Sequence, residues 1–423
     1  MAKVITIFEH GKLEVGTIYG KEDHSVCFTE RHFDALVRHN ERCGYNLFEI
    51  GHSRIVMKQY VGVIAVDDIT IEILPKADAI ENTRRWRNAL INMLKVAHEL
   101  PLHDAGHAHL RLRNTSVLEH FLQLFVREVQ TLVHRGLVKQ YRQRKGLQFS
   151  LKGRLDLPRH IQQSTVSRER FAVIHQSYDT NHVLHAILKK ALGVVKSVTR
   201  DGLTQALVHD VECAFESVDD RPGTSEVIKK IRLGRKTRAY SEALQLAKLI
   251  LLNFTPDVRQ GREHILSLLF DMNALFEVVV LRLMQKAARS RPGLAVTGQN
   301  RQHFWNGQHI RPDIVIRNGD GNVCCIVDTK WKVPRDNRPA DADLKQVFAY
   351  NLQFASTSSI LAYPGSQSSD TALIAFEPSA ASQLRHSVGL RFLEIFDENG
   401  HLRTDSVSCI LDAVSVSPSL LAQ

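Results

Sequence analysis

Strand-like alternation of apolar and polar residues dominates the first eighty positions of the chain. VITIF (4–8), KLEVGTI (12–18), RIVMKQYVGVIAV (54–66) and ITIEILPK (69–76) each follow this pattern. Alternation buries one face of a strand, and Asp67-Asp68 between the last two segments is typical of a tight turn. The pattern predicts a β-rich module over residues 1–80, with a hairpin at this turn.

A helical pattern replaces the alternation after residue 80. NHVLHAILKKALGVVKSV (181–198) is amphipathic, and apolar residues recur at helical spacing before Gly136, namely Leu118, Phe121, Leu122, Phe125 and Val129. This spacing gathers apolar side chains on one helix face. We predict a mainly helical connecting region over residues 81–255, and a short helix at 31–42 within the preceding module.

Residues 256–423 combine both patterns. EHILSLLFDMNALFEVVVLRLMQ (263–285) has the spacing of one amphipathic helix, and RPDIVIRNGDGNVCCIVDTKWK (311–332) has the Asn-Gly and Asp-Gly pairs of a hairpin. DADLKQVFAYNLQF (341–354) predicts a helix, and SSILAYP (358–364) a strand. This order indicates an α/β domain with a mixed sheet. The whole chain is therefore predicted to be an α+β multidomain protein.

Three charged residues stand in the apolar strands of the predicted 311–332 hairpin. Asp328 and Lys330 are two positions apart and therefore point to one face, while Asp313 lies on the partner strand. Two carboxylates on adjacent strands can converge on one hard cation, with the Thr329 carbonyl beside it, which suits Mg²⁺ or Mn²⁺. Such a metal polarises a phosphodiester, and Lys330 would orient the attacking water or stabilise the transition state. The alternative is a surface hairpin with an ion pair.

Charge and composition narrow the function. The net charge of +10 and the pI of about 9.3 favour a polyanionic partner. Basic residues concentrate at 133–160 and 229–238, which we interpret either as contact surfaces or as solvated faces and linkers. The six cysteines include no CxxC pair, so we expect a reduced, cytoplasmic protein. No apolar stretch approaches the roughly 20 residues that span a bilayer, so no membrane partner is expected.

The sequence offers one further candidate metal site and lacks a common nucleotide-binding motif. HDAGHAH (103–109) offers His103, Asp104, His107 and His109 as metal ligands, but Gly106 disfavours the helix that would align them, so we do not predict a metal there. No GxxxxGK[ST] segment occurs, which excludes a P-loop nucleotide site in this chain.

The hairpin resembles the PD-(D/E)xK nucleases through Pro312-Asp313 and Asp328-Thr329-Lys330. Gln346 and Tyr350, four apart on one helix face, are similar to the QxxxY element of several such nucleases, and Glu277 stands where related enzymes often supply a further acid. The resemblance implies that Asp313 and Asp328 bind the metal and that the catalytic residues are Asp313, Asp328, Lys330, Glu277 and Gln346. The alternatives are a solvated helix edge for Glu277 and a packing role for Tyr350.

Segments along nearly the whole chain resemble McrC, the nuclease subunit of McrBC restriction systems for modified cytosine. In the family's order they are YVGVI (60–64), IEILPK (71–76), GLVKQY (136–141), LKGRLD (151–156), YDTNHVL (178–184), DMNALFE (271–277) and the nuclease motif itself. The resemblance implies a partner, the McrB AAA+ ring, which hydrolyses GTP and translocates DNA. GTP would be used by that partner and not bound by this chain.

The resemblance gives each predicted region a role. Residues 1–80 would dock on the ring and stimulate its GTPase, and residues 256–423 would form a PD-(D/E)xK endonuclease domain that cuts methylated DNA, in defence against foreign DNA. Two alternatives remain open. The chain could act chiefly as an allosteric activator and scaffold of the ring, or it could be a stand-alone repair or junction nuclease.

Overall fold

The computed structural model of the chain describes residues 3–20, 25–43, 47–77, 82–97, 116–164, 169–220, 227–228, 231–256, 264–366, 370–377 and 385–416. The fold is mixed α/β with several sheets. It divides into two compact units, residues 118–268 and residues 3–117 together with 269–423. Within the described part of the chain, no helix has the length and apolar character needed to cross a membrane. Whether residues 1–80, 81–255 and 256–423 act as separate functional modules stays a prediction.

Helices make up most of the first unit. They are α3 (Val117–Arg135), α4 (Leu157–Ser164), α5 (Val183–Val198), α6 (Gly202–Glu212) and α8 (Ser241–Leu252), with the short 3-10 helices η2 (Cys213–Phe215) and η3 (Arg235–Tyr240). Side-chain caps begin two of them, because His182 accepts a hydrogen bond from Leu184 N and Asp201 accepts one from Thr204 N. The helices predicted from the apolar spacing at 118–129 and 181–198 are confirmed.

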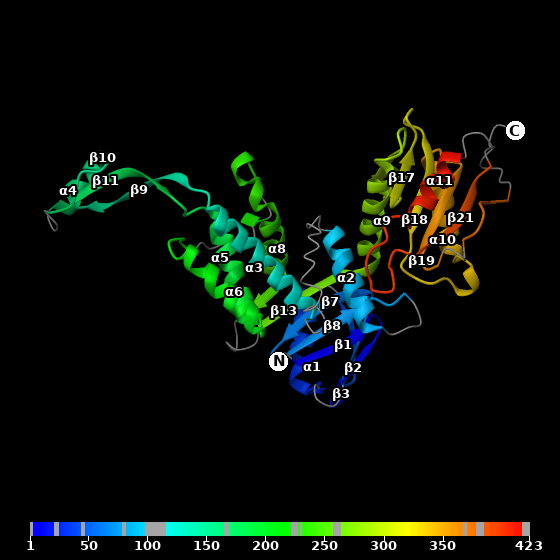
Figure 1. Cartoon of the computed structure of the whole chain (residues 1–423), viewed down its shortest axis with the longest axis horizontal. Coiled ribbons are helices and arrows are strands. Elements are labelled where there is room, and N and C mark those ends of the chain that lie inside the picture. Colours follow the sequence, from blue (N-terminus) through cyan, green and yellow to red (C-terminus); the bar gives the residue numbers. More distant parts are fainter. Residues whose placement is uncertain are drawn as a thin grey trace. The chain divides into compact units, whose positions relative to one another are not determined.

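The first unit also holds strands that the sequence did not predict. β9 (Gln140–Gln148), β10 (Arg154–Leu155) and β11 (Phe171–Asp179) form an antiparallel sheet in the order β10-β11-β9, and β9 and β11 run as long neighbouring arrows in Figure 1. Arg142 and Arg144 on β9 both pair with Asp179, at 3.3 and 2.8 Å. Part of the basic 133–160 segment is therefore neutralised within the sheet. A short strand, β12 (Phe254–Pro256), pairs with the start of β13 (His264–Asp271).

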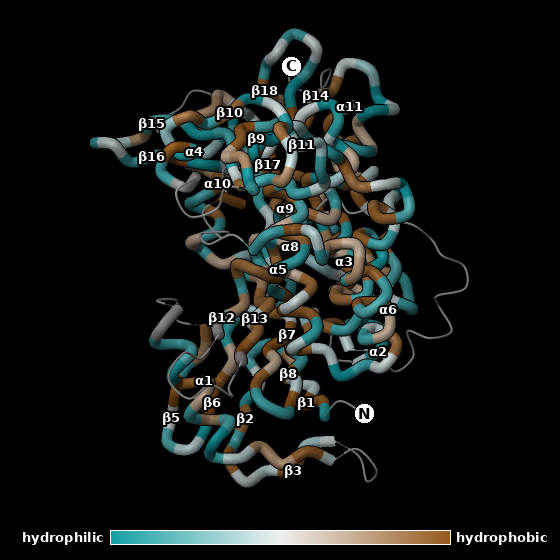
Figure 2. The backbone as a smooth tube through the Cα atoms, turned by 90° about the vertical axis from the view of Figure 1, so that its left-hand side faces the viewer, coloured by the Kyte–Doolittle hydropathy of each residue, from teal (hydrophilic) through white to brown (hydrophobic). Residues whose placement is uncertain are grey.

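The N-terminal part of the second unit is β-rich, as predicted. β1 (Lys3–Phe8) runs parallel to β8 (Ile69–Leu74), and β7 (Tyr60–Val66) pairs antiparallel with β8 from Val66 opposite Ile69. The hairpin around Asp67-Asp68 is therefore confirmed. Both of its strands are strongly apolar, as the brown colour of β7 and β8 shows in Figure 2, and β8 is buried along its whole length.

Smaller elements surround these strands. β2 (Lys12–Glu14), β6 (Arg54–Met57) and β5 (Phe48–Gly51) form a sheet in that order, and β3 (Ile18–Tyr19) pairs with β4 (Val26–Cys27). α1 (Glu30–Cys43) confirms the helix predicted at 31–42. α2 (Thr83–Ala97) follows β8 along the chain.

A six-stranded mixed sheet forms the C-terminal part of the second unit (Figure 1). Its order is β14 (Ala295–Gly298), β17 (Ile314–Arg317), β18 (Val323–Thr329), β19 (Ser358–Pro364), β21 (Ser387–Leu393) and β20 (Ile374–Ala375). β18, β19 and β21 are parallel, whereas β14, β17 and β20 run antiparallel to their neighbours. The helices are α9 (Met272–Ala288), α10 (Asp341–Gln353), α11 (Ser408–Val416) and the 3-10 turn η4 (Arg335–Asn337). Side chains of β17, β18, β19, β21 and α10 share one core.

The prediction of one helix over residues 263–285 is wrong. Strand β13 occupies its first part, and α9 begins only at Met272, where the side chain of Asp271 accepts a hydrogen bond from Ala274 N. An apolar run as short as ILSLLF has no periodicity that separates a buried strand from a helix. The capping carboxylate of Asp271 marks the change from one to the other.

Trp331 joins the two sequence segments of the second unit. Its Nε1 donates a 2.7 Å hydrogen bond to Oε1 of Glu9, just beyond β1, and its ring lies 5.2 Å from that of Phe276 on α9. Trp86 on α2 packs edge-on against Trp331 at 6.3 Å. Burial raises the pKa of Glu9. Trp331, which directly follows Lys330, is therefore held by residues of both segments, 3–117 and 269–423.

Candidate active site

The β17–β18 hairpin brings the two predicted aspartates to one end. Ile314 pairs with Val327, so the register extended by one step places Asp313 opposite Asp328. Alternation puts apolar residues of both strands into the core, where Val315 and Ile326 are fully buried. The carboxylates thus lie at the edge of a rigid, well-packed sheet.

Two hydrogen bonds from one residue hold Asp313. Its Oδ2 accepts from the backbone N of Thr329 at 2.8 Å and from the Thr329 hydroxyl at 2.9 Å. Both donors are at the end of β18, one residue beyond Asp328. The side chain of Asp313 is therefore fixed toward the neighbouring strand.

Asp328 is buried beside one cation and other acids. The residue is 1% exposed, and its Oδ2 lies 2.8 Å from Lys330 Nζ in an ion pair. Burial raises the pKa of Asp328 to about 7, and the Asp313 carboxylate adds to the rise while Lys330 opposes it. The site therefore concentrates negative charge that its own donors do not fully balance.

Lys330 is held by three polar side chains. Besides the ion pair with Asp328, its Nζ donates to Gln346 Oε1 at 2.9 Å and lies 3.8 Å from Asp343 Oδ1. Burial alone lowers the pKa of Lys330, but the surrounding carboxylates outweigh it and raise the pKa. Lys330 is therefore a cation with a fixed position beside Asp328.

Gln346 is part of a chain of hydrogen bonds that runs through Tyr350 on α10. Its Nε2 donates to the Tyr350 hydroxyl at 2.7 Å, and that hydroxyl donates to the carbonyl of Arg311 at 3.1 Å. Tyr350 is 5% exposed and lies in the shared core, and burial followed by the charge of Asp328 raises its pKa to about 12. The phenol therefore stays protonated, and it both packs and orients Gln346.

Glu277 on α9 faces the same place. It is 9% exposed, and its Oε1 accepts from Gln299 Nε2 at 3.1 Å, while Gln299 N donates to the carbonyl of Asp313 at 2.9 Å. Burial raises the pKa of Glu277, and the Asp313 charge raises it further. Glu277 is thus buried rather than solvated, and the structure brings all five predicted residues together.

The sequence profile of the McrBC 5-methylcytosine restriction system component family matches residues 55–364. This match covers most of the chain. The chain belongs to the McrBC family.

Two solved structures share the fold of this McrBC family member. One is a chain of the refined half-complex from the tetradecameric assembly of Thermococcus gammatolerans McrB AAA+ hexamers with bound McrC. It has a TM-score of 0.71 and 20% identity, over 97% of this chain and 100% of that one. The cryo-EM structure of the Thermococcus gammatolerans McrBC complex gives a TM-score of 0.52 and 23% identity, over 66% and 87%. Among curated proteins, none matches the chain.

Three polar residues in this McrBC-family site were not predicted. Asp343 on the first turn of α10 is 7% exposed and lies 2.6 Å from Lys332 Nζ. It stands three residues before Gln346 and so on the same helix face, a signal available in the sequence. The hydroxyl of Thr329 and the amide of Gln299 carry no such signal, because their roles depend on strand register and on a loop.

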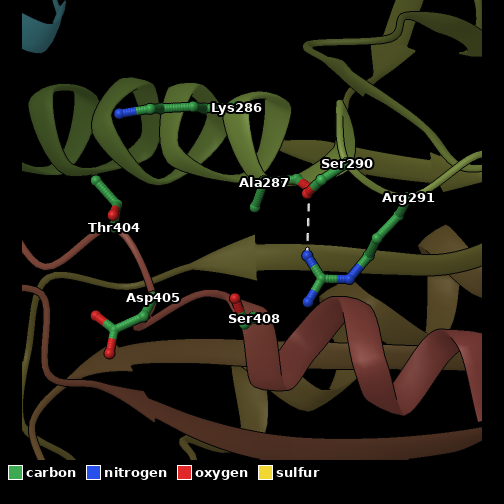
Figure 3. A pocket seen from close by; sticks show the side chains of 7 residues that line it. All are labelled: Lys286, Ala287, Ser290, Arg291, Thr404, Asp405 and Ser408. Atoms are coloured by element: carbon green, nitrogen blue, oxygen red, sulfur yellow. Dashed lines mark hydrogen bonds between the residues drawn. The ribbon is translucent and has the colours of Figure 1, made fainter.

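The structure also contains a cavity that does not include the candidate catalytic residues. A cavity of about 550 Å³ opens between α9 and the segment leading into α11, lined by Lys286, Ser290, Arg291 and Ser408 among others (Figure 3). Arg291 there is neutralised by Asp412 at 2.7 Å. None of the five predicted residues lines it, and the 103–109 histidine segment lies outside the described residues.

Proposed function

We propose that this chain is the metal-dependent DNA endonuclease subunit of a GTP-dependent restriction complex that cuts DNA containing methylcytosine. Its C-terminal sheet would be a PD-(D/E)xK nuclease fold, and an McrB-like AAA+ ring would be its partner. The observation that carries the proposal is the meeting of the buried Asp328 carboxylate with Asp313 and Lys330 at the end of the hairpin. Membership of a restriction-system family supports the same activity.

The donor set fits a hard divalent cation. Asp313 and Asp328, with the main-chain oxygen of Thr329, would hold Mg²⁺ or Mn²⁺, and the buried Oδ2 of Asp328 faces a single cation, Lys330 at 2.8 Å, with the Asp313 carboxylate across the hairpin. The described residues contain no group of three or more His, Cys, Asp or Glu side chains able to hold a metal. Water would complete the shell, as Mg²⁺ prefers. When bound, such a cation polarises the phosphodiester and lowers the pKa of a coordinated water.

The remaining residues prepare the substrate and the transition state. Lys330 presents a fixed positive charge toward the phosphate, where negative charge develops during attack. Gln346 holds the ammonium group at 2.9 Å and is itself held by Tyr350, so Lys330 needs no rearrangement before reaction. Glu277, its pKa raised by burial, is placed to accept or donate a proton near Asp313.

The first experiment tests cleavage. Asp328→Ala in the complex with the AAA+ partner should cut methylated DNA far more slowly than the unaltered chain. Asp320→Ala is the matched control, because Asp320 lies exposed in the turn at the other end of the same hairpin. Undiminished cleavage by Asp328→Ala would refute the nuclease assignment.

A second experiment separates nuclease from activator. Lys330→Ala should lose cleavage yet still raise the partner's GTP turnover, because the half-buried Lys330 side chain is engaged with Asp328 and Gln346 in the nuclease site. Loss of GTP turnover as well would show that the two roles cannot be separated in this way. Efficient, selective cutting by the chain without a partner would favour the stand-alone nuclease.

A further inference from the structure

A small hairpin next to the candidate site has no role in the chemistry above. β15 (Gln302–Trp305) and β16 (Gln308–Ile310) pair antiparallel around Asn306-Gly307, whose φ angles are 36° and 79°. Positive φ at both turn positions is the hallmark of the tight two-residue turn that Asn-Gly favours. Figure 2 shows the hairpin as a narrow loop reaching beyond α10 and β17.

The tip of this hairpin carries two exposed aromatic rings. Phe304 is 59% exposed and Trp305 is 66% exposed. The other two tryptophans of the chain, Trp86 and Trp331, are 2% and 9% exposed. Adjacent solvent-facing aromatic side chains on a protruding turn add nothing to the core, so they indicate a surface that contacts another molecule.

The base of the hairpin is tied to the catalytic residues. Gln353 Nε2 on α10 donates to the carbonyl of His303 at 3.2 Å, and Tyr350 on the same helix donates to the carbonyl of Arg311 at 3.1 Å. β16 then leads within three residues to Asp313. The rings are therefore mounted on a support that shares α10 with Gln346.

The positive charge near the hairpin indicates which kind of molecule its exposed rings would contact. Residues 278–312 contain no Asp or Glu and six Lys or Arg. Arg301 and Arg311 flank the hairpin and are exposed, and the rings of His303 and His309 lie 4.3 Å apart across its strands. Two exposed rings flanked by two exposed arginines match a base and the phosphates next to it.

We propose that the β15–β16 tip binds the DNA substrate beside the cleaved phosphodiester, with Phe304 and Trp305 against bases and Arg301 and Arg311 against phosphates. This inference rests on the nuclease function proposed above. Because ring stacking is tolerant of base identity, the tip positions the DNA without reading the modified cytosine.

Affinity is the first test, measured on the complex with its AAA+ partner and fluorescently labelled DNA, with Ca²⁺ in place of Mg²⁺. The double variant Phe304→Ala/Trp305→Ala should raise the Kd about tenfold or more, the usual scale for lost base stacking. Phe304→Tyr/Trp305→Phe retains both rings and should stay within about threefold of the unaltered chain. Ile374→Ala is the matched control, because Ile374 is 62% exposed on β20 of the same unit.

The second test is photocrosslinking, which identifies the molecule that lies next to the hairpin tip in the complex. Trp305→p-benzoylphenylalanine, irradiated in the same complex, should crosslink to DNA, whereas the same replacement at Ile374 should not. Crosslinking to the partner protein instead would make the tip a protein contact and overturn the inference, as would an unchanged Kd in the alanine double variant. Failure of the nuclease proposal has a different signature, since Asp328→Ala would then cut normally whatever the Kd values are.

Discussion

Two buried carboxylates on strands of the second unit, Glu72 and Asp328, have opposite surroundings. Glu72 on β8 is fully buried, and Arg87 donates to it through Nε and Nη2 at 2.5–3.0 Å, while the backbone N of Val117 adds a further bond at 2.9 Å. Asp328 on β18 is 1% exposed and has one cationic partner, Lys330 at 2.8 Å, while Asp313 lies across the hairpin and Asp343 adds a further negative charge.

This difference distinguishes a carboxylate that stabilises the fold, Glu72, from one that is available for catalysis, Asp328. Removing a carboxylate from water is costly unless donors replace the water, and Arg87 with Val117 does this for Glu72. At Asp328, Lys330 does part of this, but Asp313 and Asp343 increase the cost. A buried acid whose neighbours are mostly other acids is poised for a cation, and a fully satisfied one holds the fold together.

The largest effect is expected from Asp328→Asn, which preserves shape and removes the charge. Cleavage should fall at least about a thousandfold, because the metal-binding charge is lost. The free energy of unfolding should change little, because the lost ion pair with Lys330 is offset by removal of a buried charge beside Asp313, and Lys330 keeps Gln346 and Asp343 as partners. Gel-based cleavage rates and urea unfolding would measure both. A variant that is much less stable but equally active would reverse the comparison.

Glu72→Gln should show the opposite profile. Breaking the buried ion pair leaves Arg87 without its counter-charge, so the free energy of unfolding should drop by about 3–5 kcal/mol. Cleavage per folded molecule should be unchanged. Glu49→Gln serves as the control in urea unfolding. The Glu49 side chain is 70% exposed, and its carboxylate comes no closer than 4.0 Å to the ammonium group of Lys58, so this ion pair is weak. Equal stabilities for the two variants would contradict the structural role of Glu72.

Binding of a divalent metal ion should also distinguish Asp328 from Glu72. Mg²⁺ or Mn²⁺ at about 100 times its Kd should stabilise the unaltered chain by roughly 2.7 kcal/mol, and Glu72→Gln by a similar amount, but Asp328→Asn hardly at all. Thermal melting with and without the metal would show this. Cleavage should require Mg²⁺ or Mn²⁺ and fail with Ca²⁺ alone, since Ca²⁺ relaxes the geometry of attack. Strong activity in EDTA would contradict the metal assignment.

The smallest effect is expected from an exposed acid of the same helix as Gln346. Asp341 pairs with Lys345 at 2.6 Å, but their side chains are 78% and 76% exposed. Solvent screens such a pair, so Asp341→Asn should leave both the unfolding midpoint and the cleavage rate within experimental error. A clear loss of cleavage would show that the first turn of α10 takes part in the site more widely than Asp343.

Local patterns predicted the elements whose own residues determine them. The 311–332 hairpin carries its turn pairs and its apolar alternation, and α10 carries its helical spacing, so both were found. β9 was missed because its side chains are mostly polar or basic and none is buried, and β11 because its apolar residues form one short run at its start, so neither shows apolar alternation. β13 was missed because its apolar run continues directly into α9.

The site shows the same division. Asp313, Asp328 and Lys330 could be predicted because strand periodicity and hairpin pairing decide which of their side chains meet. The contacts of Gln299 with Glu277 and of Asp343 with Lys332 join segments whose approach depends on tertiary packing. No periodicity in the chain encodes that approach.

The hydrogen bond between Glu9 and Trp331 has a consequence for recombining genes. It ties residues 322 positions apart, and one of them directly follows Lys330. A chimaera that takes its nuclease segment from one parent and its N-terminal segment from another would pair a tryptophan with a foreign residue 9. Productive crossovers should therefore fall in pairs that exchange residues 118–268 as a cassette, leaving 3–117 and 269–423 from the same parent.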